Sequence, residues 1–397
     1  MSHPPSATIP KDVAEVPLLI AGQGVCLFEY INNDQNVCLF SITNHQHSDG
    51  LIIEWATDGV TVVRINSSVH YTDPKNSKGL LNKNGAFYWF SLDAQHQTFY
   101  AGIGEARQET KIYQYTMPYA TDDERKSNKA FLESLTKVGY FQNVTPLRLL
   151  RNPVIQNIPF HIKDAISLDA IAKGLYLCKS HLSSVSQQMY DCVVDTVLDT
   201  DDFPDFSKAV QQSIADGWCK KQLIKKSNEF SKSGPPNLKE TYLRITLGTN
   251  NGNSPGIPYV MEIWPAGHYS PIHSHANAEA VIKVLHGSIH VSLFPFLGGD
   301  QFLSANFNKD DITWISPDLN QIHQLQNDTS DVCITIQCYM YDQKNRLHYD
   351  YFDYLDDTNQ VQQYEPDSDM DFIAFKELMR TEWENRQPNG LFGCFRV

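Results

Sequence analysis

The sequence predicts a mainly β protein with a helical middle segment, organised as two β units. Residues 16–117 consist of short alternating apolar and polar runs separated by turn residues, which is typical of strands. Residues 120–234 instead space their apolar side chains three and four apart, as helices do. Residues 241–354 return to strand-like runs, and a length of 397 residues fits more than one domain.

Composition and charge place the chain among globular proteins and exclude some partners. Hydrophobic residues make up 41% of the chain and charged residues 20%. The net charge of -14 argues against nucleic acid and anionic membranes as the main partners, because both are negatively charged. The eight cysteines form no CxxC pair, and no apolar run approaches the length of a membrane helix. Because the N-terminus has no signal-peptide pattern, we expect a cytoplasmic protein with reduced thiols.

The first domain is expected to be a β-sandwich over residues 14–120. The preceding residues 1–13 are rich in proline and serine, which predicts a flexible arm. The run LIIEWATDGVTVVRINSS alternates apolar and polar residues around Asp58 and Gly59, a pair that favours a hairpin turn. Aromatic residues fill the strand-like runs that follow, as in the core of a sandwich.

The segment GAFYWFSLDAQHQTFYAGIGEARQETKIYQY, residues 85–115, resembles the domain named after farnesoic acid O-methyltransferase. The likeness covers roughly the first 120 residues. The name does not imply methyl transfer here, because Gly102 and Gly104 lack the third glycine and the strand–helix context of a nucleotide-binding loop. We therefore expect this domain to contact a protein or a ligand.

The middle of the chain is expected to be a helical connector over residues 121–234. Helical spacing occurs in DDERKSNKAFLESLTKVGYF, in SLDAIAKGLYLCKSHLSSVSQQMYDCVVDTVL and in FSKAVQQSIADGWCKKQLIKKSNEF. A linker-like stretch, SKSGPPNLKE, leads into a second β domain over residues 235–360. Residues 361–397 are expected to form a C-terminal helix and tail.

The run GHYSPIHSHANAEAVIKVLHG, from Gly267 to Gly287, carries the clearest chemical signal. Because residues two apart in a strand point to one face, His273 and His275 should project side by side. Neutral imidazoles on one face can bind a divalent transition metal. We expect His323, in the strand-like run ITWISPDLNQIHQLQN, to supply the third ligand.

Four stretches share their order and spacing with one enzyme family. They are YLRITL, the glycine-framed run above, IHQLQN, and CITIQCY once one residue is deleted. Together they resemble the cupin superfamily and, within it, the cysteine dioxygenase family of thiol dioxygenases. The glycine-framed HxH corresponds to the first cupin motif, and His323 followed by Asn327 corresponds to the second. The likeness covers about a third of the chain and implies a jelly-roll β-barrel.

The resemblance implies Fe²⁺ as cofactor, held by His273, His275 and His323, with O₂ and a small thiol carboxylate as substrates. Cysteine is the default thiol, and a sulfinic acid is the product. Physical reasoning agrees, since three neutral histidines leave about half of an octahedral ion open to thiolate and O₂. Arg244, with its permanently charged planar fork, would bind the substrate carboxylate, and Tyr242 lies on the same strand face.

Three further residues share one strand face at the active site that the resemblance implies. Thr335, Gln337 and Tyr339 alternate along one strand, so Gln337 could orient the phenol of Tyr339 beside the substrate. Tyr339 is thus a second candidate catalytic residue. Arg244 could instead pair with an acidic residue across the sheet, and Tyr339 could serve core packing.

Two departures from the family pattern leave alternatives open. Ala280 stands where animal cysteine dioxygenases have the cysteine that is crosslinked to tyrosine, and Gln337 stands where the family usually has histidine. Both leave 3-mercaptopropionate or another small thiol carboxylate as an alternative substrate. Glu279 follows the HxH at a spacing near that of a fourth cupin ligand. It is either a ligand or an exposed or supporting carboxylate, since strand parity decides which face it uses. A cupin enzyme with three histidines and one glutamate, and a metal-free binding scaffold, are the competing interpretations.

Overall fold

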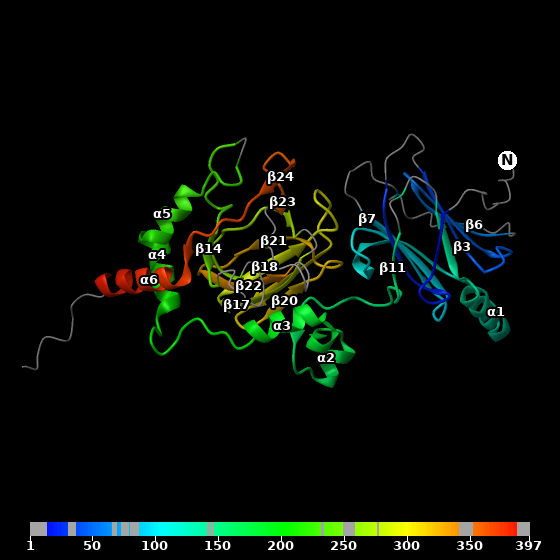
Figure 1. Ribbon diagram of the computed structural model, residues 1–397, viewed down its shortest axis with the longest axis horizontal. Helices are drawn as coiled ribbons and strands as arrows, with labels where there is room; N and C mark the ends of the chain where they lie inside the picture. Colours follow the sequence, from blue (N-terminus) through cyan, green and yellow to red (C-terminus); the bar gives the residue numbers. More distant parts are fainter. Residues whose placement is uncertain are drawn as a thin grey trace, which may run out of the picture. The chain divides into compact units, whose positions relative to one another are not determined.

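Residue contacts divide the chain into two units, Met1–Asn157 and Ile158–Val397 (Figure 1). The computed structural model describes residues 14–30, 37–65, 70–72, 79, 87–140, 144, 147–231, 234–248, 259–275, 278–340 and 352–386. The predicted arm at residues 1–13 and the tail after residue 386 lie outside the described residues. Among the described helices, none is long and apolar enough to cross a membrane.

The first unit is built from two antiparallel sheets. One has six strands in the order β1 (Ala14–Pro17), β10 (Lys137–Tyr140), β3 (Val37–Thr43), β4 (Gly50–Ala56), β5 (Gly59–Arg64) and β6 (His70–Thr72). The other has five, in the order β11 (Arg148–Leu150), β2 (Gln23–Glu29), β7 (Phe87–Asp93), β8 (Thr98–Ile103) and β9 (Lys111–Thr116). The predicted hairpin at Asp58 and Gly59 is confirmed, because Ala56 pairs with Gly59 where β4 turns into β5.

Aromatic side chains fill the space between these two sheets. Phe28 lies 4.6 Å from Phe40 and 5.4 Å from Trp55, measured between ring centroids. Phe40 in turn lies 5.2 Å from Phe90, and all of these side chains are buried. Offset and edge-on rings of this kind bury large apolar areas. The predicted N-terminal β-sandwich is therefore confirmed.

The first unit extends beyond the predicted boundary at residue 120. Helix α1 (Asp122–Glu133) begins at a capping box formed by Thr121 and Glu124. Strand β10 then inserts between β1 and β3, and β11 joins the edge of the other sheet beside β2. The prediction of a helical connector over residues 121–234 is wrong up to residue 157. Local spacing could not show that these short strands pair with partners about a hundred residues earlier.

The second unit carries two six-stranded sheets. The first has the order β20 (Ile312–Ile315), β17 (Glu279–His286), β22 (Cys333–Met340), β15 (Tyr259–Trp264), β14 (Leu243–Thr246) and β25 (Met370–Asp371). The second has the order β19 (Leu303–Asn308), β18 (Ser288–Leu293), β21 (Ile322–Gln326), β16 (His273–Ser274), β23 (Phe352–Leu355) and β24 (Val361–Tyr364). A short parallel pair, β12 (Ile162–Lys163) and β13 (Leu177–Cys178), lies beside β20, where His161 and Thr313 form an isolated bridge.

The strand order within these sheets is that of a jelly roll. Among the eight consecutive strands β15 to β22, β15 lies beside β22, and β16 lies beside β21. Gly287, with a φ of 74°, makes the turn from β17 to β18. A Cβ atom there would lie 2.5 Å from the backbone oxygen of Val332, so only glycine fits. The predicted C-terminal cupin-type barrel is thus confirmed by its topology.

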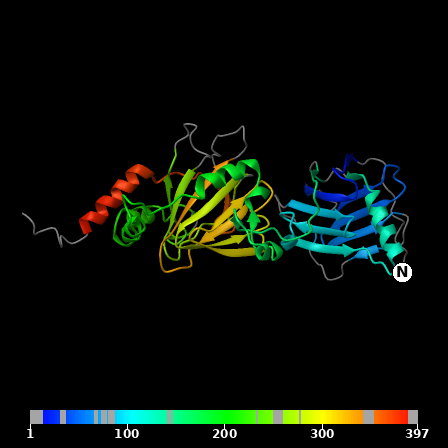
Figure 2. The ribbon, with the colours of Figure 1, turned by 90° about the horizontal axis from the view of Figure 1, so that it is seen from below.

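Helices cover the outside of the barrel (Figure 2). Helix α3 (Ser184–Val193) packs on β17 and β22, and the short α2 (Leu168–Ala172) precedes it. Helices α4 (Phe206–Asp216), α5 (Trp218–Lys225) and α6 (Phe372–Arg386) form a cluster whose apolar side chains pack against β14 and β15. The predicted C-terminal helix is confirmed as α6. The predicted end of the β domain at residue 360 is too early, because β24 and β25 follow it.

Candidate metal centre

Three histidines from two strands meet inside the barrel. Strands β16 and β21 are antiparallel neighbours, and their register places His273 directly opposite His323. His275 follows the end of β16 and points to the same place. The ligand nitrogens of the three residues all lie within 4.8 Å of one another, and the Nε2 atoms of His275 and His323 are 3.0 Å apart. The structure thus brings together the three residues that the sequence predicted as metal ligands.

These imidazoles are held in their neutral, metal-binding form. Burial lowers the pKa of His273 to about 4, and it lowers the pKa values of His275 and His323 well below the ordinary value. His275 and His323 are only 1% and 2% exposed, so water cannot stabilise the charged imidazolium. Because neutral imidazole is the form that binds a metal, the cluster needs no deprotonation step at neutral pH.

The histidine donor set fits a divalent transition metal. Nδ1 of His273 lies 3.0 Å from the carbonyl oxygen of Pro271, so Nδ1 carries the proton and donates to that oxygen. The lone pair of Nε2 is then free for a metal, as in most histidine metal sites. Three nitrogen ligands without a carboxylate suit iron, zinc, copper or nickel. These residues could therefore hold a metal ion.

The three histidines line a cavity of about 450 Å³, its open mouth included. One part of its wall is aromatic and the other is polar. The remaining lining residues are Phe230, Tyr242, Arg244, Glu262, Trp264, Pro271, Leu325, Gln337, Tyr339, Phe352, Tyr354 and Tyr364. A concave apolar site with a few convergent polar groups is typical of small-molecule binding.

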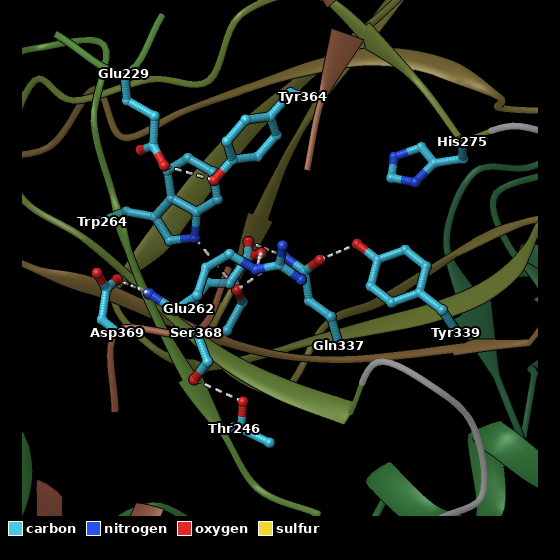
Figure 3. A network of polar contacts seen from close by, with 12 residues as sticks. Glu229, Thr246, Glu262, Trp264, His275, Gln337, Tyr339, Tyr364, Ser368 and Asp369 are labelled. Carbon is cyan, nitrogen blue, oxygen red and sulfur yellow. Dashed lines mark hydrogen bonds and ion pairs between the residues drawn. The ribbon is translucent and has the colours of Figure 1, made fainter. Parts of the chain in front are cut away.

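A chain of polar contacts runs along the polar wall towards the histidines (Figure 3). Nε of Arg244 lies 3.4 Å from Oε1 of Glu262. The other carboxylate oxygen accepts a hydrogen bond from the side-chain amide of Gln337, and the carbonyl oxygen of that amide accepts from the hydroxyl of Tyr339. Thr335 accepts from the amide of Gln337 at 3.3 Å. The predicted alternation of Thr335, Gln337 and Tyr339 on one face is confirmed.

Glu262 changes the electrostatics that the sequence suggested for this wall. Burial alone would lower the pKa of Arg244, but the charge of Glu262 raises it above its ordinary value. Burial raises the pKa of Glu262 to about 7, although Arg244 opposes this shift. The open interpretation that Arg244 pairs with an acidic residue across the sheet is therefore confirmed. The same guanidinium still lines the cavity, so the pair does not remove it from the site.

Tyr339 connects the polar chain to the metal centre. Its ring stacks on that of His275, with centroids 5.4 Å apart and an angle of 18° between the planes. Across the neighbouring strand, Tyr339 pairs directly with Ala280. The two residues also share a small buried cluster. A methyl side chain at position 280 leaves no sulfur beside the phenol.

Tyr242 lies in the aromatic part of the wall. Its ring stacks on Trp264 with centroids 4.3 Å apart, and Phe230 lies beyond it at 6.3 Å. Burial raises the pKa of its phenol well above the ordinary value, so the hydroxyl stays protonated. The expectation that Tyr242 and Arg244 share one strand face is confirmed, because both line the cavity.

Glu279 does not belong to the site, and both interpretations that placed it there are wrong. Its carboxylate accepts hydrogen bonds from the hydroxyls of Ser183 and Ser186 at the start of α3, the second at 2.7 Å. Strand parity explains this placement. In β17 the side chains of Val281 and Leu285 pack on the α3 side, whereas Ala280 faces the interior. Glu279 therefore points outwards to the helix.

Sequence reasoning missed the other residues that line the cavity, among them Glu262, Tyr354 and Tyr364. Glu262 had a signal, since it is a lone charge in the apolar run YVMEIW. Tyr354 and Tyr364 had none, because their stretch lies outside the motifs and reaches the cavity only through pairing. His273 pairs with Tyr354 across β16 and β23, and β24 brings Tyr364 alongside.

Comparison with known proteins finds similarity to solved structures over less than a third of the chain. No family model matches the chain. A cupin superfamily protein from Desulfitobacterium hafniense is 10% identical, with 26% of this chain and 81% of that chain covered and a TM-score of 0.20. A cupin domain of a transcriptional regulator from Enterobacter cloacae is 16% identical, with coverages of 21% and 81% and a TM-score of 0.18. An oxalate oxidase bound to glycolate is 16% identical, with coverages of 30% and 56% and a TM-score of 0.23.

The second unit is a cupin-type barrel with a candidate metal centre. This conclusion rests on the jelly-roll strand order and on the three histidines that converge inside it. The arrangement can hold one ion at the wall of a cavity that a guanidinium, a carboxylate and a phenol also line.

Proposed function

We propose that the chain is an iron-dependent thiol dioxygenase that oxidises a small thiol carboxylate, with cysteine as the default, to its sulfinic acid. The observation that carries the proposal is the convergence of three neutral histidines and Arg244 on one cavity. The three histidines would hold Fe²⁺, and the guanidinium would bind the carboxylate of the substrate through its planar fork. The family resemblance of the four motif stretches supports the choice of reaction.

The reaction is balanced without a further reductant. One thiol and one O₂ give one sulfinic acid, so sulfur loses four electrons and both oxygen atoms accept them. When bound, the ferrous ion would supply adjacent positions at which thiolate and O₂ can react. The chain would hold the carboxylate on Arg244, place the phenol of Tyr339 beside the reacting group, and exclude water with the rings of Tyr242 and Trp264.

The position of Glu279 counts against the competing enzyme class. A site with three histidines and one glutamate needs a carboxylate directed into the barrel, and Glu279 is directed to α3. Glu262 is the carboxylate that lines the cavity, but it contacts Arg244 and does not belong to the cluster of potential ligand atoms. Among the described residues, we therefore propose the three histidines as the complete set of protein ligands.

Metal analysis followed by an oxygen-electrode assay tests the proposal. Purified protein should contain or take up stoichiometric iron, and the iron-loaded protein should consume O₂ when cysteine or 3-mercaptopropionate is added. The product should be the corresponding sulfinic acid, identified by mass spectrometry. Stoichiometric metal without thiol-dependent O₂ uptake would reject the dioxygenase and leave another metalloenzyme. Absence of bound metal would support a binding scaffold instead.

A further inference from the structure

Glu262 is a buried carboxylate for which the proposed reaction has no direct use. It lies inside β15 between apolar neighbours and is only 5% exposed. A carboxylate at such a depth is strongly destabilising unless other groups hold it. The side chains that hold it, Arg244 and Gln337, both line the cavity beside the histidines. Its partners therefore belong to the site and not to the apolar core.

Strand register places this carboxylate at the centre of the polar wall. Arg244, Glu262 and Thr335 lie directly opposite one another on the adjacent strands β14, β15 and β22. Side chains in such a row share one face and touch across the strands. Glu262 thereby contacts Arg244 on one side and, through Gln337, the chain that ends at Tyr339 on the other (Figure 3).

The chemistry of the donors gives this chain of hydrogen bonds one direction. Above its pKa of about 7 the carboxylate of Glu262 is ionised and can only accept, so the amide nitrogen of Gln337 faces it. The indole of Trp264 can only donate, so Thr335 accepts from it at 3.3 Å. The carbonyl oxygen of Gln337 is left facing Tyr339, and it can only accept the phenolic proton. Tyr339 therefore donates to Gln337.

We propose that Glu262 is a positioning residue of the site. By orienting the amide of Gln337 it directs the single proton of the Tyr339 hydroxyl away from the substrate, so that the phenol oxygen meets the substrate as a hydrogen-bond acceptor. With an uncharged group at position 262, the amide of Gln337 could turn either way and the direction of the chain would be lost.

Exchanging the two side chains tests the direction of the chain. In full-length, iron-loaded protein, Glu262→Gln should lower kcat for cysteine and 3-mercaptopropionate about tenfold, as expected for losing one hydrogen bond to a charged group, with little change in KM. The double variant E262Q/Q337E should recover most of kcat. In it the carboxylate at position 337 again accepts from Tyr339, and the amide at position 262 donates to it. A double variant no better than E262Q would overturn the proposal.

Two further variants control this test. Glu382→Gln alters a carboxylate on α6 that accepts from the backbone nitrogen of Trp218 and does not line the cavity, so it should match the wild type. Gln337→Met cuts the chain at the next link and should lower kcat as E262Q does. It provides the same test if E262Q does not fold. A Gln337→Met variant with unchanged kcat would also overturn the proposal.

The kinetic test of this inference rests on the proposed function. A spectroscopic measurement that needs no enzymatic activity tests the inference separately. Carbon-13-labelled tyrosine gives a ring resonance for Tyr339, assigned by its loss in Tyr339→Phe. We expect this resonance to shift in E262Q and to return in the double variant. If it does so while no thiol supports O₂ uptake, the dioxygenase proposal fails and the positioning role stands. A resonance unmoved in E262Q would reject the positioning role even in an active enzyme.

Discussion

The two β units have interiors filled by different kinds of side chain. Between the sheets of the first unit, Phe28, Phe40, Trp55 and Phe90 pack ring against ring and are almost fully buried. Inside the barrel of the second unit, the same kind of enclosed space holds three histidines and an arginine–glutamate pair around a cavity. Both interiors are enclosed by antiparallel sheets, so the architecture alone does not separate them.

This difference shows where polar groups can be buried without a large loss of folding free energy. Buried polar groups need partners, and the barrel provides them through strand register. Arg244 lies opposite Glu262, and His273 lies opposite His323. The space between the sandwich sheets is filled by aromatic rings instead, and their burial requires shape complementarity. The buried ion pairs of the first unit, Arg107 with Glu105 and Glu109, lie in the stretch between β8 and β9. Variants in the two units should therefore fail in different ways.

Removing one histidine should produce the largest effect. His323→Ala should abolish thiol-dependent O₂ uptake. It should also lower metal affinity by at least about 10–100-fold, the range found when a residue that only hydrogen-bonds a metal ligand is removed. Metal content after gel filtration and the oxygen electrode measure this. His96→Ala, at an exposed histidine of the sandwich that contacts Asp93, should bind metal like the wild type. Full metal content in His323→Ala would remove the basis of the comparison.

Truncating a ring in the sandwich should cost stability and spare the metal site. Phe90→Ala removes a buried ring between the sheets and should lower the free energy of unfolding by about 3–5 kcal/mol. Urea unfolding measures the loss, and metal analysis should show unchanged binding in the folded protein. Loss of metal from folded Phe90→Ala would show that the two interiors are not independent.

Acidification should destabilise the metal-free barrel. Burial lowers the pKa of His273 to about 4, so the unfolded chain binds a proton near pH 6.5 while the folded chain does not. Stability present above pH 6.5 is therefore lost as the pH falls towards 4, by at most about 3 kcal/mol for this residue. Urea unfolding in the presence of a chelator measures this. Over this pH range His273→Gln should lose less unfolding free energy than the wild type. Equal losses of unfolding free energy in the two proteins would contradict the lowered pKa of His273, because the other titrating groups are common to both proteins.

Replacing the arginine of the polar wall should weaken substrate binding selectively. Arg244→Lys keeps the positive charge beside Glu262 but loses the planar fork. KM for a thiol carboxylate should rise about tenfold, as expected when one hydrogen bond to a charged group is lost, with a smaller change in kcat. Arg64→Lys in the sandwich, where Arg64 pairs with Asp49 at 2.7 Å, should leave KM unchanged. A KM that does not move in Arg244→Lys would exclude Arg244 as the carboxylate-binding residue.

The smallest effect is expected at Glu279. Glu279→Gln should weaken the hydrogen bonds at the start of α3 and cost about 1 kcal/mol of stability, with metal content unchanged. Glu124→Gln in the capping box of α1 is the matched change in the first unit and should behave alike. Reduced iron content in Glu279→Gln alone would restore the four-ligand site.

The sequence predicted the positions of some site residues and not of others, and each outcome has a physical reason. The three histidines could be predicted because two of them share a strand face and the third lies in another strand-like run of the same motif set. The destination of Glu279 could not, because a shift of one residue in a strand reverses the face on which a side chain lies. The end of the first domain was missed for a related reason. The local sequence KVGY in β10 does not indicate that this strand pairs with β1 and β3.

The sequence by itself determined the class of each unit and the composition of the candidate centre. Alternating apolar residues specify strands, and the glycine-framed histidine pair specifies nitrogen ligands on one face. Only the tertiary structure decided which side chains meet across strands. It placed His323 opposite His273, set Arg244 against Glu262 instead of leaving it alone in the cavity, and turned Glu279 away from the metal centre. These contacts depend on pairing and register between distant strands, which hydrogen bonding over the whole sheet selects and no local pattern encodes.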